Sequence, residues 1–220
     1  MTNTLFTYAL VDLFPVTAEV YARLFVRLNE AVWPAHGVAL AVGIAALFLA
    51  CSGRPRAVPA LLALAWFWAG YAFYIDLYAH LNWAAWWVGV VFIGQAIVLL
   101  ACSLGQRRAQ GRTALNPVGC GIAAFGLFVW PLLGPLMGRP WAGIELFGIA
   151  PAPTVVVTLG LLLTLPRYRL LVLPVPLLWS FVVAVPTAMA LNDPDGYAAG
   201  AIAVLVVAAW VTRAVRGRSD

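Results

Sequence analysis

The chain has 220 residues, of which 64% are apolar, 13% aromatic and only 10% charged, and its mean hydropathy is +0.96. A typical soluble domain carries about 25% charged residues and about 45–50% apolar ones. The 13 basic and 8 acidic side chains are too few to cover a particle of 23.6 kDa in water, so the excess apolar surface must face lipid. The composition excludes a soluble domain and predicts an integral membrane protein.

All 13 basic residues are arginines, and the sequence contains no lysine. Chemistry that needs a Schiff-base amine, including covalent attachment of retinal or pyridoxal, is therefore excluded. The net charge of +5 comes from arginines beside apolar runs, which indicates membrane topology and not nucleic-acid binding. Cys51, Cys102 and Cys120 form no CxxC pair, so we expect neither a disulfide framework nor a thiolate zinc site.

The first predicted element is an amphipathic helix over residues 17–33, in which charged and apolar side chains alternate at helical spacing. Thr17 is its candidate N-cap, and we expect the helix to lie in the membrane interface. The first 30 residues lack the charged start and apolar run of a signal peptide, so we expect no cleavable leader.

Seven apolar runs follow, and a membrane-crossing helix needs about 20 such residues, with a range of about 17–25. They lie near 35–51, 57–78, 84–104, 118–137, 153–165, 170–191 and 197–212. The fifth is the weakest, because 13 residues that rise about 1.5 Å each reach only about 20 Å. It crosses only if it tilts little, thins the bilayer or begins further back near Ile149; otherwise it is re-entrant and six spans remain.

We therefore predict an all-α fold, a polytopic transmembrane helix bundle of seven spans, with six as the alternative. No linker or soluble insertion long enough to fold alone is visible, so residues 1–220 form a single membrane domain. Arginines gather in alternate connections, and short basic loops stay cytoplasmic, so we expect the N-terminus outside and the C-terminus inside. The other connections hold only Arg139, whereas the arginines that follow the odd-numbered runs are Arg54, Arg56, Arg107, Arg108, Arg112, Arg167, Arg169, Arg213, Arg216 and Arg218.

Ionisable side chains near apolar runs are expensive in a bilayer and are therefore the candidates for a site. With this topology they all lie at the extracytoplasmic end, and they comprise Glu30, His36, Asp76, His80, Glu145, Asp193 and Asp195. The last two belong to an Asn-Asp-Pro-Asp-Gly segment, whose composition is typical of a turn. The acidic loops can also be explained simply as what remains once arginine is excluded from the outer side.

Asp76 and His80 are four residues apart, which places them on one face of a helix about 6 Å from each other. Such a pair can relay a proton or supply two ligands to a divalent metal, although an interfacial pair in water needs no function.

Gln95, inside the third run, needs a partner on a neighbouring helix or in a substrate. Thr154 follows two prolines at the start of the fifth run, where free N–H groups can receive an anion or a carbonyl oxygen.

Five segments in chain order carry a family resemblance: Leu28–Pro34, Leu81–Trp86, Trp130–Gly134, Phe147–Thr154 and Pro176–Trp179. With them, the chain resembles a bacterial membrane family, domain of unknown function 6064. The resemblance implies a small protein of the bacterial inner membrane with six or seven helices, and it carries no activity. It directs attention to Asn29, Glu30, Trp33, Asn82 and Thr154. Relatives often have a cysteine where this chain has Ala152, so a thiolate site there is absent.

Three functions stay open. The first is a transporter or channel for a small solute or ion, with a polar site in the extracytoplasmic half that is formed by Glu30, Trp33, Asp76, His80, Asn82, Gln95, Glu145 and Thr154. The second is a metal- or haem-binding redox protein or enzyme with His36, His80 and Asp76 as ligands. The third is a non-catalytic partner subunit of a membrane complex. We expect the bilayer, a small molecule or ion and, in one alternative, further copies of the chain as partners, but no nucleic acid.

Overall fold

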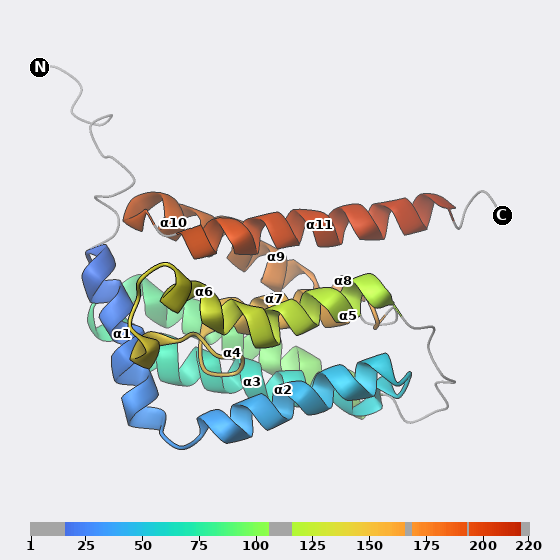
Figure 1. Ribbon diagram of the computed structural model, residues 1–220. Helices are drawn as coiled ribbons and strands as arrows, with labels where there is room; N and C mark the ends of the chain where they lie inside the picture. The colour runs from blue at the N-terminus through green and yellow to red at the C-terminus, as the bar shows by residue number, and fades with distance from the viewer. Residues whose placement is uncertain (1–15, 106–115, 166–168, 193, 217–220) are drawn as a thin grey trace, which may run out of the picture.

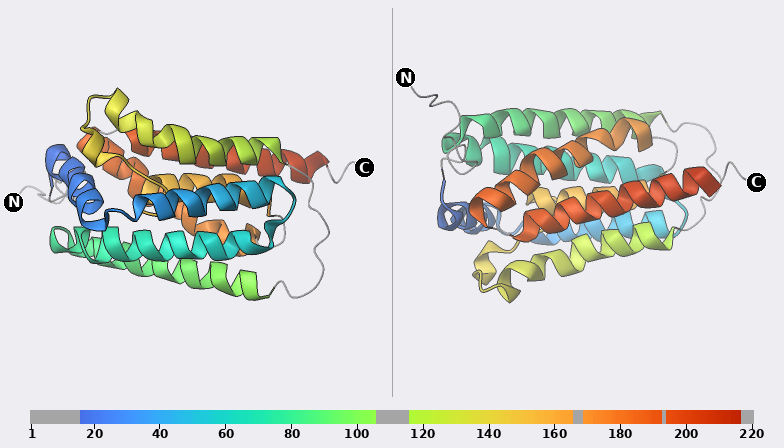
Figure 2. Two further views of the ribbon diagram at one scale, coloured as in Figure 1. Left: turned by 60° about the horizontal axis from the view of Figure 1, so that its bottom comes forward. Right: turned by 90° about the horizontal axis from the view of Figure 1, so that it is seen from above.

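The chain forms a bundle of helices, as the composition predicts. A computed structural model describes residues 16–105, 116–165, 169–192 and 194–216, and over these ranges it contains helices and no strand. Figures 1 and 2 show the long helices side by side between the same two ends, with α1 lying across one of them. We call this the α1 end; the opposite one, where Arg54 and Arg56 lie between α2 and α3, is the arginine end.

The amphipathic helix is confirmed as α1 (Ala18–Val32). The Thr17 side chain accepts a hydrogen bond from the Val20 N–H at 3.3 Å and caps it, as predicted. One face of α1 is buried on the bundle and holds Leu24, Phe25, Leu28 and Asn29. The chain then turns by 97° into α2 (His36–Cys51). Helix α1 therefore lies across the end of the bundle at which α2 begins.

The next two apolar runs form a helical hairpin. Its first arm consists of η3 (Pro55–Ala57), α3 (Val58–Trp68) and the π-helix η4 (Ala69–Ile75), and it ends in the 3-10 helix η5 (Tyr78–His80). The second arm is α4 (Trp83–Leu104). The arms approach closely because Gly70 and Gly89 face each other: a Cβ on Gly89 would lie 3.0 Å from the Gly70 carbonyl oxygen.

The second half of the chain contains two further π-helical segments. The fourth run forms α5 (Pro117–Ala124), the π-helix η6 (Phe125–Val129) and α6 (Trp130–Leu136), followed by η7 (Trp141–Gly143). After α7 (Pro151–Leu162), the sixth run comprises α8 (Arg169–Val172), α9 (Pro174–Trp179), the π-helix η8 (Ser180–Ala184) and α10 (Val185–Leu191). The last helix is α11 (Pro194–Arg216).

Five helices in the described ranges are long and apolar enough to cross a membrane, and the bent pair of α1 and α2 raises the number to six if it counts as one span. The five are Pro55–His80, Trp83–Leu104, Pro117–Leu136, Leu170–Leu191 and Pro194–Thr212. These lengths and compositions suggest a membrane protein. The count of seven spans stays a prediction, and Arg107, Arg108, Arg112, Arg167 and Arg218, on which its orientation partly depends, lie outside the described residues.

The fifth run is a broken element. Its helix, α7, has 12 residues, begins at Pro151 and is buried at every position except Ala152. An irregular segment over 144–150 leads into it from the α1 end, and Phe147 and Ile149 in that segment are each only 1% exposed. Irregular backbone at membrane depth is tolerated where protein encloses it, and the neighbouring helices enclose this segment.

A disulfide joins Cys51, at the end of α2, to Cys120 in α5. Our expectation of no disulfide from the cysteine spacing is therefore wrong for this pair. The two residues are 69 positions apart in sequence, and only the packing of α2 beside α5 brings them together. Cys102 is a free, buried cysteine.

Candidate functional site

A buried ionic cluster lies near the α1 end. The Arg139 guanidinium forms ion pairs with the Glu145 carboxylate at 3.4 Å and with the Asp195 carboxylate. Glu145 is 7% exposed and Asp195 is 5% exposed. Burying an ionised carboxylate costs several kcal/mol unless a counter-charge accompanies it, so the shared guanidinium is what allows both side chains to be there. We call these three residues the ionic cluster.

Aromatic side chains in or beside three π-helical segments lie near this cluster. Trp130, the residue after η6, donates its Nε1–H to Glu145 Oε2 at 3.3 Å. Trp179, the residue before η8, donates its Nε1–H to the Tyr74 hydroxyl of η4 at 2.6 Å. π-Helical segments are rare and often mark functional positions. Here three of them, from three different spans, contain or adjoin the aromatic residues Tyr74, Trp130 and Trp179.

Two cavities adjoin the cluster. The inner chamber has a volume of about 30 Å³, and its walls include Glu145, Asp195, Trp179 and Thr187. The outer vestibule has a volume of about 300 Å³, and its walls include Glu19, Arg139 and Asn192. Tyr21 of α1 borders both cavities. Arg139 therefore lies on the vestibule side, while the two carboxylates it binds line the chamber, which has room for a water-sized occupant.

Local backbone features place the three charged groups. The Arg139 N–H donates to the Gly134 carbonyl at 2.9 Å, and Gly134 leaves room for the guanidinium, since a Cβ there would lie 3.2 Å from Arg139 Nε. Glu145 follows a segment that α1 holds: Asn29 Nδ2 donates to the carbonyls of Ala142 at 2.8 Å and Ile144 at 2.9 Å. Asp195 lies in the first turn of α11.

Of the predicted site residues, Glu145 alone belongs to the cluster. The side chains of Glu30, Asp76 and His80 are exposed, and Trp33 is 73% exposed. Asp76 follows the π-helix η4 and His80 belongs to the 3-10 helix η5, so the four-residue spacing does not place them on one α-helical face. That argument needs a continuous α-helix, which ends before Asp76. Asp193 lies outside the described residues.

The predicted metal ligands stay apart. The described ranges contain no group of three or more His, Cys, Asp or Glu residues that could hold a metal ion, so His36, Asp76 and His80 do not form one. His36 instead has its Nε2 atom 3.2 Å from Asn29 Oδ1. Its Nδ1 atom is buried and has no hydrogen-bond partner within the part of the chain that the structure describes. The described residues therefore give no support to a three-ligand metal site at these positions.

The remaining predicted residues join structural elements. Asn82 caps α4 by accepting the Ala84 N–H at 3.0 Å. Gln95 has its partner on a neighbouring helix, because Nε2 donates to the Val172 carbonyl at 2.8 Å. The Thr154 hydroxyl accepts the Gly148 N–H at 2.8 Å and donates to the Ala150 carbonyl at 2.7 Å, which fastens the irregular segment to α7. All three polar side chains have partners inside the protein.

Sequence reasoning missed Arg139 as a member of the site, and it named Asp195 among the ionisable candidates but not among the residues of the proposed polar site. Arg139 carried a usable signal, since it is the only arginine in the connections that the alternation leaves without basic residues. An arginine in a connection on the extracytoplasmic side is expected to pair with a carboxylate. Asp195 carried the same signal as Glu145, an ionisable side chain near an apolar run, but its sequence context is also that of an ordinary turn.

A family model matches residues 18–218, and its description is a family of unknown function, DUF6064. The chain belongs to the DUF6064 family. The resemblance expected from the short sequence motifs is thereby confirmed. No curated protein and no solved structure matches this DUF6064 chain. Function must therefore be argued from the ionic cluster and the cavities beside it.

Proposed function

We propose that this DUF6064 protein is a membrane transporter or channel for a small cation or a proton. The observation that carries the proposal is the ionic cluster, in which Glu145 and Asp195 share the Arg139 guanidinium beside a chamber of about 30 Å³. Ionisable side chains inside membrane bundles are expensive and commonly mark ion pathways and proton relays. The vestibule of about 300 Å³ supports access to the cluster from the α1 end.

The proposed mechanism is an exchange of counter-charges. A cation or proton that reaches the chamber binds one carboxylate in place of the Arg139 guanidinium, which moves toward the vestibule that it already borders. The exchange keeps a positive charge beside each carboxylate and so avoids the cost of an uncompensated buried charge. The small volume of the chamber favours a proton or a small ion over an organic solute.

Flux measurements on reconstituted protein test the proposal. Purified protein in proteoliposomes is assayed with a pH-sensitive dye for protons and with tracer uptake for monovalent cations. We expect Glu145→Gln and Asp195→Asn each to abolish the flux, because each removes a negative charge from the chamber. Asp76→Asn, which neutralises an exposed carboxylate, is the matched control and is expected to leave the flux unchanged.

Wild-type flux in folded Glu145→Gln and Asp195→Asn proteins would refute the role of the ionic cluster. If only Asp76→Asn or Glu30→Gln loses flux, the transport site lies instead at the exposed carboxylates that the sequence analysis favours. Circular dichroism and size-exclusion chromatography confirm that each variant is folded before its flux is compared.

A further inference from the structure

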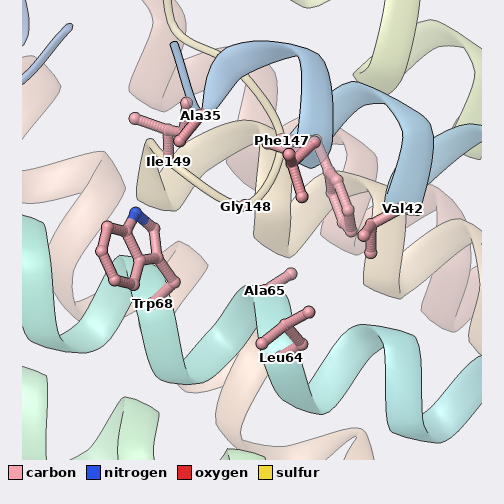
Figure 3. Close-up of a pocket in the computed structure, with 10 residues that line it drawn as sticks. Ala35, Val42, Leu64, Ala65, Trp68, Phe147, Gly148 and Ile149 are labelled. Carbon is pink, nitrogen blue, oxygen red and sulfur yellow. The ribbon is translucent and has the colours of Figure 1, made fainter. Parts of the chain in front are cut away.

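A second cavity, separate from the ionic cluster, lies between α2 and α3. Its volume is about 240 Å³, and every residue that lines it is apolar or glycine. Figure 3 shows Val42 on one wall, Leu64, Ala65 and Trp68 on the other, and Phe147 to Ile149 beside the gap. We call this cavity the apolar crevice. The Trp68 indole Nε1–H is the only polar side-chain group among the residues that line it.

Small residues create the crevice. Gly148 has a φ of +77°, a conformation that favours glycine, and a Cβ there would lie 3.5 Å from Ala65 Cβ and 3.7 Å from Ala39 Cβ. Phe147 and Ile149, on either side of it, are each 1% exposed and form the floor. Leucine at position 39 or 65 would fill the space.

The mouth of the crevice opens on the surface that faces lipid in a membrane bundle. Leu64 and Trp68 belong to the candidate span Pro55–His80 and are 53% and 38% exposed, and Val38 on the opposite wall is 64% exposed. Trp33, 73% exposed, precedes the first lining residue, Ala35, and exposed tryptophans collect at the headgroup level. From Ala35 to Val42 the α2 wall extends inward by about 10 Å.

We propose that the apolar crevice binds one acyl chain of a bilayer lipid. The crevice begins near the headgroup level and continues into the hydrocarbon region, which is the course an acyl chain takes. A helix, with a diameter of about 10–12 Å, is too wide for this volume. Because lipid tails are as apolar as leucine, the gain comes from dispersion contacts that an empty crevice would lack, and not from the hydrophobic effect.

The bound chain also contacts the segment that carries Glu145, one of the three residues of the ionic cluster. Phe147, in the floor of the crevice, is two residues from Glu145, and the same segment continues into α7. Occupancy of the crevice therefore supports the position of Glu145. The binding of the chain itself does not depend on the proposed transport.

Photocrosslinking tests the proposal. Purified protein is reconstituted into vesicles with phosphatidylethanolamine that carries a diazirine in the middle of one acyl chain, irradiated, and mapped by peptide mass spectrometry. Surrounding lipid can label the exposed Val38 and Leu64, whereas it reaches Phe147 and Ile149 only through the crevice. We expect labelling of residues 147–149 in the wild type and its loss in Ala39→Leu, with labelling of Val38 and Leu64 retained.

Two further variants separate the possible outcomes. Ala65→Leu fills the crevice from the other wall and is expected to give the same loss if Ala39→Leu does not fold. Ala101→Leu enlarges an exposed position on α4 and is expected to keep the label on 147–149. The proposal is overturned if only the exposed residues are labelled in the wild type, or if the filled variants keep their label on 147–149.

Discussion

Asn29 is the residue that joins α1 to the segment before Glu145. Its Nδ2 group donates to the carbonyls of Ala142 and Ile144, and its Oδ1 atom faces His36 Nε2. Leucine has the same number of side-chain heavy atoms and the same branching but leaves these partners without their hydrogen bonds. We expect Asn29→Leu to lower the free energy of unfolding by about 1–3 kcal/mol, the usual cost of unsatisfied buried polar groups.

Thermal unfolding in detergent, followed by circular dichroism, measures this effect. The control is Glu30→Gln, a change at the next position, where the side chain is exposed and the expected effect is within about 0.5 kcal/mol. An unchanged unfolding midpoint for Asn29→Leu would show that α1 is held mainly by its apolar face.

Gly134 controls the space beside Arg139. A Cβ at this position would lie 3.2 Å from Arg139 Nε and 3.5 Å from Cζ, so the guanidinium must shift by a few tenths of an ångström. We expect Gly134→Ala to lower cation or proton flux in proteoliposomes while the protein stays folded. Gly94→Ala on α4, with nothing within 4 Å of the added Cβ, is the control and should keep full flux. Equal flux in the two variants would separate Arg139 from the transport step.

The two carboxylates of the ionic cluster differ in how far the sequence predicts them. Glu145 stands close to apolar runs, and the cost of burying a charge was enough to select it. Asp195 becomes buried only because α11 packs tightly on η8, where Gly196 allows the helix to approach the Ala184 carbonyl. That approach depends on tertiary packing between elements, which the turn-like sequence around Asp195 does not reveal.

At the scale of elements, the crossing of α5 and α7 depends on two glycines. A Cβ on Gly160 would lie 2.7 Å from the Gly119 carbonyl oxygen and 3.1 Å from Ala123 Cα. Both neighbours are backbone atoms, which cannot move aside as a side chain can. We expect Gly160→Ala to lower the free energy of unfolding by about 1–3 kcal/mol, the usual cost of overpacking.

Gly121→Ala, in the same helix pair, provides the comparison, because an added Cβ there meets nothing within 4 Å. Replacing a helical glycine at an open position should stabilise the protein by about 0.5–1 kcal/mol. Opposite shifts of the unfolding midpoint in the two variants are therefore expected. A midpoint for Gly160→Ala at or above the wild-type value would contradict the tight crossing.

Hydropathy predicts the long helices well and the broken ones poorly. The runs near 84–104, 118–137 and 170–191 agree within one residue with the spans Trp83–Leu104, Pro117–Leu136 and Leu170–Leu191. The fifth run is equally apolar, but apolar composition cannot distinguish a lipid-facing span from the enclosed helix α7. The π-helical segments are also invisible in the sequence, because each depends on packing rather than on a residue pattern.

At the scale of the whole molecule, charge is divided between the two ends of the bundle. Arg54 and Arg56 lie between α2 and α3 at the arginine end, and α8 begins and α11 ends there (Figure 1). The ionic cluster lies near the α1 end, where α1 residues line the same cavities and α1 also carries Arg23 and Arg27. Basic connections stay in the cytoplasm. We therefore predict a protein of the bacterial inner membrane with the arginine end in the cytoplasm and the N-terminal side outside.

Reporter fusions measure this orientation. Green fluorescent protein fused after Arg216 should fluoresce, and alkaline phosphatase inserted between η5 and α4 should be active, because the first folds in the cytoplasm and the second outside it.

The Cys51–Cys120 pair gives an independent measurement, since it lies at the arginine end and disulfides are rare in reducing cytoplasm. We expect the cytoplasm to keep this pair reduced, so that both thiols react with N-ethylmaleimide in untreated cells. In a parallel sample without maleimide, a mild oxidant should join them, because their Cα atoms are 6.3 Å apart and within the range of a disulfide.

Cys102, the buried free cysteine of α4, is the internal control and should form no bond with either residue. A disulfide already complete in untreated cells, together with an active phosphatase fusion after Arg216, would place the arginine end outside. That result would make the arginine alternation a consequence of packing rather than of topology. It would also mean that the vestibule opens to the cytoplasm, so that the flux assay would report transport from the cytoplasmic side.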